Sequence, residues 1–248
     1  MTDSSSPVTD ADLVGMRVGH RAMRADLHRL TATVADLAHG AVPSTRAHAV
    51  ADYVDLLVTS IENHHRNEDD YLWPVLRHVA VEHIDLGELV EDHTELESML
   101  QEARRWATKL HPGEPDALSG LAEALAQLRD LLDEHINDEE QAIFPLITGY
   151  IDQKTWVGIE KQARKGAQLD FEGPRVIAVT TPQERDQLGR KYKIMVRVVL
   201  PVLRRQQRRR ERAVFGSAPM PLRRFIPDAV PRERDPRDPT RSNPRSTS

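Results

Sequence analysis

The chain has 248 residues, 11 histidines and no cysteine. The lack of cysteine excludes a disulfide scaffold, thiolate zinc sites, cysteine-ligated iron–sulfur clusters and cysteine nucleophiles. The charge is divided unequally: residues 1–150 carry 28 acidic and 11 basic residues and every histidine, whereas residues 151–248 carry 11 acidic and 23 basic residues. No run of about 18 apolar residues occurs, so no membrane span is expected. The polar N-terminus lacks the layout of a signal peptide, and we expect a cytoplasmic protein.

The first 150 residues contain four stretches in which apolar positions recur in alternating steps of three and four. They lie at about 13–37, 44–75, 86–110 and 118–146. This spacing is typical of the inward-facing seam of an amphipathic helix. The polar residues 1–9 are expected to be disordered. Four long helices with modest connections predict an all-α, up-down-up-down four-helix bundle over residues 10–150.

The composition changes after Tyr150. Asp152 is expected to cap a short helix over about 153–166, and the stretch 175–180 is expected to be helix or extended loop. A loop is predicted from three residues: Gly166, Gly173 and Pro174.

A further amphipathic run starts at Pro182 and is expected to break at Pro201. We therefore predict a basic helical extension over residues 151–215. Residues 216–248 are rich in Pro, Arg, Asp and Ser, which predicts a disordered tail.

Six polar residues occupy seam positions that should be apolar, and they are spread over all four predicted helices. They are His20, His64, Glu68, His93, His135 and Glu139. Burying unpaired carboxylates is costly, so a cation that neutralises and binds them explains the set. Imidazole and carboxylate donors without sulfur suit iron, manganese or zinc. Six donors are too many for one ordinary zinc site and fit two metals that share the carboxylates.

The chain also contains an internal repeat. His64 and Glu68 are spaced i, i+4, as are His135 and Glu139, so each pair lies on one helix face. Each pair is followed by a proline ten residues after its histidine. The bundle is therefore predicted to be a duplicated helical hairpin, with a pseudo-two-fold axis that brings the two half-sites face to face.

The pattern H-HxxxE-H-HxxxE resembles the hemerythrin-like (HHE cation-binding) family, in particular its bacterial members, over about residues 10–150. This resemblance implies a non-haem site with two iron ions and no haem. His20 and His64 would be terminal ligands of one iron, and His93 and His135 of the other. Glu68 and Glu139 would bridge the ions, together with an oxo, hydroxo or water ligand.

One position departs from the oxygen-carrying hemerythrins, which have a second histidine one turn after the histidine of the third helix. Here that position is Glu97. A set poorer in imidazole favours ferric iron and open coordination positions. The expectation therefore moves from reversible O₂ carriage toward reaction with O₂, peroxide or nitric oxide, including catalase-like peroxide decomposition.

Several neighbouring residues have two interpretations. Glu97 is either a seventh ligand or a solvated side chain, and Tyr53 either lines the site or packs in the core. His65, one step off the seam, is expected to be exposed or to touch a ligand. Four acidic residues are expected on solvated faces, where any of them could orient a ligand histidine: Asp69, Asp70, Asp138 and Glu140.

Three functions are open at this point. The first is a di-iron protein with redox activity toward peroxide, O₂ or nitric oxide, with turnover undecided. The second is a module that binds or senses O₂ or iron without turnover. The third is a regulatory interaction protein that acts through the segment Arg204–Arg212, in which six of nine residues are Arg. No nucleic-acid reader motif accompanies this segment, so nucleic-acid binding is not expected. The oligomeric state is left open.

Overall fold

A computed structural model of the chain describes residues 6–80, 86–191, 200–217 and 221–227. The predictions for residues 1–5, for 192–199 and for most of the C-terminal tail concern residues outside these described ranges. The bundle is built from four long helices, one of which is extended by two further helical segments. They are α1 (Val14–Leu37), α2 (Ser44–Asn67) with η1 (Glu68–Leu72) and α3 (Trp73–Val79), α4 (Gly87–Thr108) and α5 (Ala117–Tyr150).

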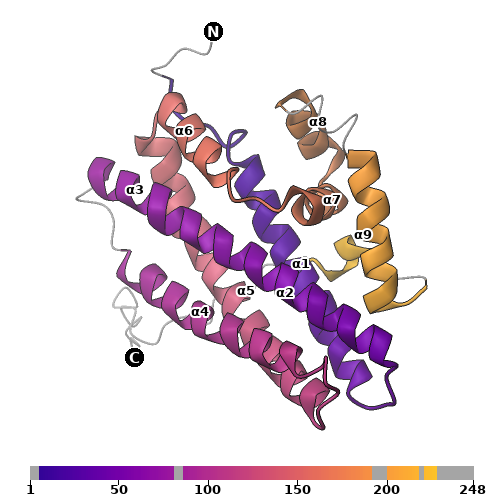
Figure 1. The fold of residues 1–248 in the computed structure, drawn as a ribbon. Helices are drawn as coiled ribbons and strands as arrows, with labels where there is room; N and C mark the ends of the chain where they lie inside the picture. Colours follow the sequence, from indigo (N-terminus) through magenta and orange to yellow (C-terminus); the bar gives the residue numbers. More distant parts are fainter. Residues whose placement is uncertain (1–5, 81–85, 192–199, 218–220, 228–248) are drawn as a thin grey trace, which may run out of the picture.

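The predicted all-α bundle is confirmed (Figure 1). The helix pairs α1–α5, α4–α5, α2–α4 and α1–α2 are in contact, which closes the ring of four. The seam residues of α1 and α2, such as Leu30 and Val54, are fully buried. Two apolar clusters result, one at each end of the bundle, and the polar seam residues lie between them. Within the described residues, no helix is long and apolar enough to cross a membrane.

Pro74 was predicted to kink or end the second helix, and the structure accommodates it with a π-helical turn. The N–H of Trp73 bonds to the carbonyl of Glu68, five residues earlier. Pro74 has no N–H to donate, and its ring would clash with the carbonyl one α-helical turn earlier. The wider π turn relieves this conflict and lets the helix continue as α3. The turn starts at Glu68, one of the predicted metal ligands.

The extension is helical, and it covers the bundle on the side of α1 and α2 away from α4 (Figure 1). Its elements are α6 (Gln153–Ala163), α7 (Leu169–Val179), α8 (Pro182–Lys191), α9 (Leu200–Phe215) and the 3₁₀ turn η3 (Leu222–Phe225). The predicted cap of α6 is present, because Asp152 accepts a hydrogen bond of 2.9 Å from the Thr155 N–H.

The predicted loop at Gly173 and Pro174 is wrong, since both residues lie inside α7. Pro174 cannot bond to the carbonyl of Asp170 four residues before it. Arg210 of α9 donates to that carbonyl instead, at 3.3 Å. The helix is therefore completed by a residue 36 positions away from the proline, which no local pattern reveals.

Both chain ends are more ordered than expected where the structure describes them. Val8 is buried, and its N–H bonds to the carbonyl of Ile151 at 3.1 Å. Leu222 of η3 is buried against α1, beside Val18 and Ala22. The segments just outside the predicted bundle thus contribute to its packing.

A buried polar cluster ties the extension to the bundle. Asp26 of α1 is paired with Arg175 of α7. The Tyr53 hydroxyl of α2 donates its hydrogen to the Asp26 carboxylate and lies 2.9 Å from both carboxylate oxygens. Gln207 of α9 donates to the Tyr53 hydroxyl at 3.3 Å. All four side chains are almost completely buried. The basic extension is therefore an integral layer of the fold.

Candidate metal centre

The six predicted site residues converge in the polar layer between the two apolar clusters. Five of them are buried, and the side chain of the sixth, His64, is 21% exposed. His20 comes from α1, His64 from α2, Glu68 from η1, His93 from α4, and His135 and Glu139 from α5. The seam register thus brings one polar stretch of every bundle helix to the same level, as the spacing predicted.

The first group of donors contains His20, His64, Glu68 and Glu139, with one ligand atom of each within 4.8 Å of the others. The Nε2 atoms of His20 and His64 are 2.8 Å apart. His64 Nε2 lies 3.0 Å from Glu68 Oε1, and His20 Nε2 lies 3.5 Å from Glu139 Oε2. Two imidazoles and two carboxylates therefore face one point.

The second group contains His93 and His135 together with His65, again with one ligand atom of each within 4.8 Å of the others. The rings of His65 and His93 stack at 4.5 Å, and His65 meets His135 edge-on at 5.2 Å. His65 was expected to be exposed or in contact with a ligand. The structure buries it among the predicted ligands.

Glu68 and Glu139 lie between the two groups. Glu68 places Oε1 near His64 and Oε2 3.8 Å from His93. Glu139 Oε2 is 3.5 Å from His20 and 3.9 Å from His135. Each carboxylate therefore reaches both groups, which is the placement that a bridging ligand requires.

Many buried polar atoms of the layer have no hydrogen-bond partner among the residues that the structure describes. These atoms are Nε2 of His65, His93 and His135 and both carboxylate oxygens of Glu68 and Glu139. An unpaired buried polar atom costs about 1–3 kcal/mol, and more when it is charged. Seven such atoms that face one region fit a site for cations, which would satisfy the nitrogen and oxygen lone pairs together.

Carboxylates hold the outer nitrogens of three histidines. His20 Nδ1 lies 2.8 Å from Glu140, His93 Nδ1 2.9 Å from Asp69, and His135 Nδ1 3.2 Å from Asp92. A carboxylate at Nδ1 orients the ring and leaves the Nε2 lone pair free for a metal. Asp69 and Glu140 were among the acidic residues considered for this role, whereas Asp92 was missed.

The contacts also follow the predicted repeat. Asp69 and Glu140 each come directly after a bridging-type glutamate, and each holds the histidine of the opposite hairpin. Trp73 stacks on His93 at 5.9 Å, and Phe144, its counterpart in the repeat, stacks on His20 at 6.3 Å. The duplicated sequence pattern thus corresponds to a duplicated set of contacts.

Without a cation, the charges in the layer displace the pKa values of its members. Burial alone would lower the pKa of His20, but the nearby Glu139, Glu140 and Glu68 outweigh it and raise that pKa to about 10. Burial, and then the charge of Glu68, raises the pKa of Glu139 well above its ordinary value. Burial opposes ionisation of Glu68, but His64 and His20 hold the pKa of Glu68 well below its ordinary value. Burial, and then His93, lowers the pKa of His65.

Metal binding is therefore expected to release at least one proton per chain at neutral pH. His20 is protonated below its pKa of about 10 and must lose a proton before Nε2 can bind a metal. The affinity should rise about tenfold per pH unit for each proton released, and this rise should end as the pH passes the pKa of His20. Titrating Zn²⁺ into weakly buffered protein with a pH indicator measures the release. A pH-independent affinity between pH 6.5 and 7.5 would contradict this expectation.

Neither of the two additional candidates belongs to the donor groups found among the described residues. Tyr53 bonds to Asp26 in the cluster that anchors the extension. Glu97 is exposed and belongs to neither donor group. His65 is the residue that sequence reasoning undervalued. Adjacent helical residues point about 100° apart, so the sequence left open whether His65 is exposed or touches a ligand. The structure favours the second alternative.

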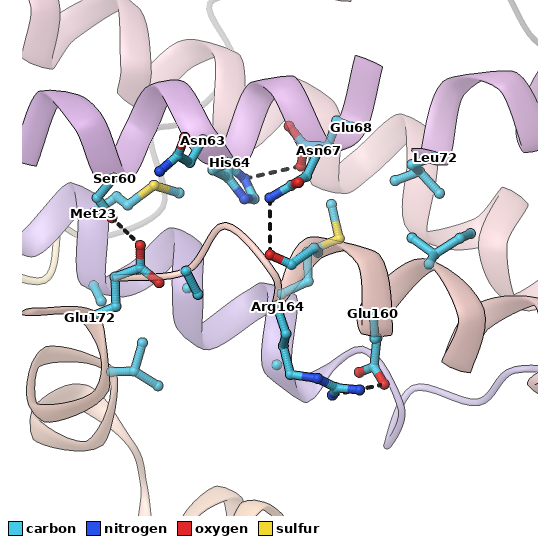
Figure 2. A pocket seen from close by; sticks show the side chains of 18 of the residues that line it. Met23, Ser60, Asn63, His64, Asn67, Glu68, Leu72, Glu160, Arg164 and Glu172 are labelled. Carbon is cyan, nitrogen blue, oxygen red and sulfur yellow. Dashed lines mark hydrogen bonds and ion pairs between the residues drawn. The ribbon is translucent and has the colours of Figure 1, made fainter. Parts of the chain in front are cut away.

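Two cavities adjoin the layer on different sides. One, of about 290 Å³, lies between the bundle and α6 and α7, and it is lined mainly by apolar side chains with His64 and Glu68 in its wall. Figure 2 shows His64 and Glu68 on one side of this cavity. Across from them lie Glu160 of α6 and Arg164, the residue directly after α6. The other, of about 500 Å³, has a polar lining that includes His65, His93, Asp69 and Glu97.

Comparison with known proteins agrees with this geometry. A family model described as the hemerythrin HHE cation-binding domain matches residues 13–147, more than half of the chain. The match spans α1, α2, α4 and most of α5, and it includes every residue of both donor groups. No curated protein and no solved structure gives a match. The chain therefore belongs to the hemerythrin HHE cation-binding family.

Proposed function

We propose that this chain is a non-haem di-iron protein that reacts with a small neutral oxidant, with hydrogen peroxide as the favoured substrate and O₂ and nitric oxide as the related ones. The observation that carries the proposal is the pair of buried donor groups with Glu68 and Glu139 between them. The proposed ligands are the six seam residues predicted from the sequence.

The donor chemistry supports two ions, and it supports iron. The layer offers only imidazole nitrogen and carboxylate oxygen, a set that suits iron better than thiolate-seeking metals. A structural zinc ion takes about four ligands in a closed tetrahedron. The two groups with their shared carboxylates exceed one such tetrahedron, and shared carboxylates are typical of paired ions in a helical bundle.

The two cavities support different roles. The apolar one, which reaches His64 and Glu68, suits the entry of a small uncharged molecule. On the polar side, Asp69 holds His93 Nδ1 and has a side chain that is 45% exposed. The polar cavity therefore gives water access to the edge of the layer at His65 and His93.

Two iron ions would supply the redox chemistry, because together they can give two electrons to one peroxide and recover them from a second. The balance is two H₂O₂ to two H₂O and one O₂. The protons released by the oxidised peroxide equal those that the reduced peroxide takes up. The chain therefore has to hold protons near the layer only briefly. The carboxylates that contact the outer nitrogens of its histidines belong to Asp69, Asp92 and Glu140, whose side chains are 45%, 32% and 29% exposed.

Iron content and a peroxide assay on the same purified sample test the proposal. We expect about two irons per chain, near-ultraviolet absorption of an oxo-bridged pair, and O₂ evolution on addition of hydrogen peroxide. A fully folded protein that takes up no iron would overturn the proposal. Reversible O₂ binding without peroxide turnover would instead identify a carrier or sensor, the second candidate function.

Filling the apolar cavity is expected to slow the reaction without removing the metal. Gly19 of α1 lines this cavity, and a Cβ placed there meets no atom within 4 Å. In Gly19→Leu the side chain should occupy the approach to His64, so the peroxide rate falls severalfold while iron content is unchanged. Gly149→Leu in α5 is the matched control, because Gly149 is also helical with open space at its Cβ and lies outside the cavity. Equal rates for both variants would exclude this route.

The arginine-rich helix α9 has a structural task in the fold. Gln207 and Val214 are buried, and Arg210 pairs with Asp170 at 2.6 Å. Four arginines remain exposed: Arg205, Arg208, Arg209 and Arg212. The regulatory alternative would require this outer face, and changing these four residues to Gln in the full chain tests it without disturbing the buried side. The proposal expects unchanged iron content and peroxide activity and no DNA band shift in either protein.

A further inference from the structure

We propose that His65 supplies a third imidazole to the cation beside His93 and His135. This inference rests on the proposed function and deepens it, because it assigns a ligand outside the six seam positions. It divides the donors unequally: three imidazoles for one ion and two, from His20 and His64, for the other, with Glu68 and Glu139 shared.

The first argument is convergence. One ligand atom from each of His65, His93 and His135 lies within 4.8 Å of the others. Nε2 of each of the three rings is buried and has no hydrogen-bond partner in the part of the chain that the structure describes. The outer nitrogens of His93 and His135 are held by Asp69 and Asp92, so their free lone pairs face the layer. His65 adds a third unpaired nitrogen to the same small region.

The second argument is the departure from the repeat. The residue after His135, at the position that corresponds to His65, is Ile136. Ile136 is buried and belongs to the apolar core of the bundle. An apolar residue is therefore what packing requires at this position. A buried imidazole without a partner costs about 1–3 kcal/mol there, and a bond to a metal would offset that cost.

The third argument concerns Glu97, the alternative source of a further ligand near His93. Its side chain is exposed on the surface of α4 and is absent from both donor groups. His65 approaches the same pair of histidines from α2, stacked on His93 with an angle of 22° between the rings. The third donor thus comes from the neighbouring helix.

The test is iron binding by His65→Phe. Phenylalanine keeps a ring of similar size that can stack on His93, but it has no nitrogen, so a role in packing alone would survive the change. His48→Phe is the matched control: His48 is also on α2, and its ring also contacts another histidine, His111, at 4.9 Å. Wild type and both variants are loaded with ⁵⁷Fe and compared by iron content, circular dichroism and Mössbauer spectroscopy.

We expect two irons per chain in wild type and His48→Phe, with two distinct Mössbauer doublets from unlike sites. His65→Phe should retain about one iron, with the doublet of the three-imidazole site lost or altered. Two irons and an unchanged spectrum in folded His65→Phe would overturn the assignment of His65 and leave the di-iron proposal intact. No iron in wild type would overturn both. If His65→Phe does not fold, His65→Gln gives the same readouts with a smaller polar side chain that lacks the imidazole.

Discussion

Replacing Glu139 with Gln is expected to remove most of the bound metal without unfolding the protein. Glu139 is completely buried, and neither of its oxygens accepts a hydrogen bond from the described residues. In Glu139→Gln one oxygen becomes an NH₂ group that points donor hydrogens at the cations. Changes to groups that only support a ligand already cost about 10–100-fold in metal affinity, so a shared ligand should cost at least as much. Iron per chain after desalting measures the loss.

The metal-free proteins supply the internal check. Burial and the charge of Glu68 raise the pKa of Glu139 well above its ordinary value, which favours the protonated form of this carboxyl when no metal is bound. Glutamine closely resembles that protonated form, and we expect metal-free Glu139→Gln to unfold at nearly the wild-type urea concentration. Glu140→Gln is the matched control, because Glu140 contacts the outer nitrogen of His20 and should still permit two irons at saturating iron. Two tightly held irons in Glu139→Gln would contradict the bridging role.

Breaking the pair between Asp26 and Arg175 is expected to be the largest single loss of folding free energy. Both side chains are almost completely buried, and Asp26→Ala leaves the Arg175 guanidinium in the interior without its counter-charge. Such losses amount to about 3–5 kcal/mol, which lowers the melting temperature of a chain of this size by about 10 °C. Thermal and urea unfolding of the metal-free protein measure the change.

Two further variants separate charge from packing. The double variant Asp26→Leu, Arg175→Met replaces both charges with apolar side chains and should recover most of the loss, because removing a buried pair together is often nearly neutral. Asp10→Ala removes a partner of the exposed pair with Arg17 and should change stability by less than about 1 kcal/mol. If Asp26→Ala lost no more free energy of unfolding than Asp10→Ala, the buried cluster would not anchor the extension.

The bundle and its polar layer could be predicted because both depend on spacing within single helices. Steps of three and four define an inward face, and any His or Glu on that face must enter the core. The positions of His20 and Glu139, for example, follow from the helix period alone. The internal repeat then brings the two halves together, since a duplicated hairpin presents the same residues at the same level.

The rest depends on contacts between elements, which spacing does not encode. His65 lies about 100° from His64 around α2, and whether that direction faces solvent or α4 depends on how the helices pack. Asp92 can hold the outer nitrogen of His135 only because α4 places Asp92 beside α5. Arg210 of α9 donates to the carbonyl that Pro174 leaves without a partner in α7. Tyr53 bonds to Asp26 in the buried cluster that residues of α7 and α9 complete. Each of these is a meeting of residues far apart in the sequence.

The polar layer draws its donors from every helix of the bundle, and this has a consequence for the motions of the protein. A helix that carries a ligand cannot open locally while the ions are held, so loading should merge the separate openings of α1, α2, α4 and α5 into one cooperative event. Amide hydrogen exchange near the layer would then slow together in all four helices. The rate at which the ions leave would report how often the whole bundle opens.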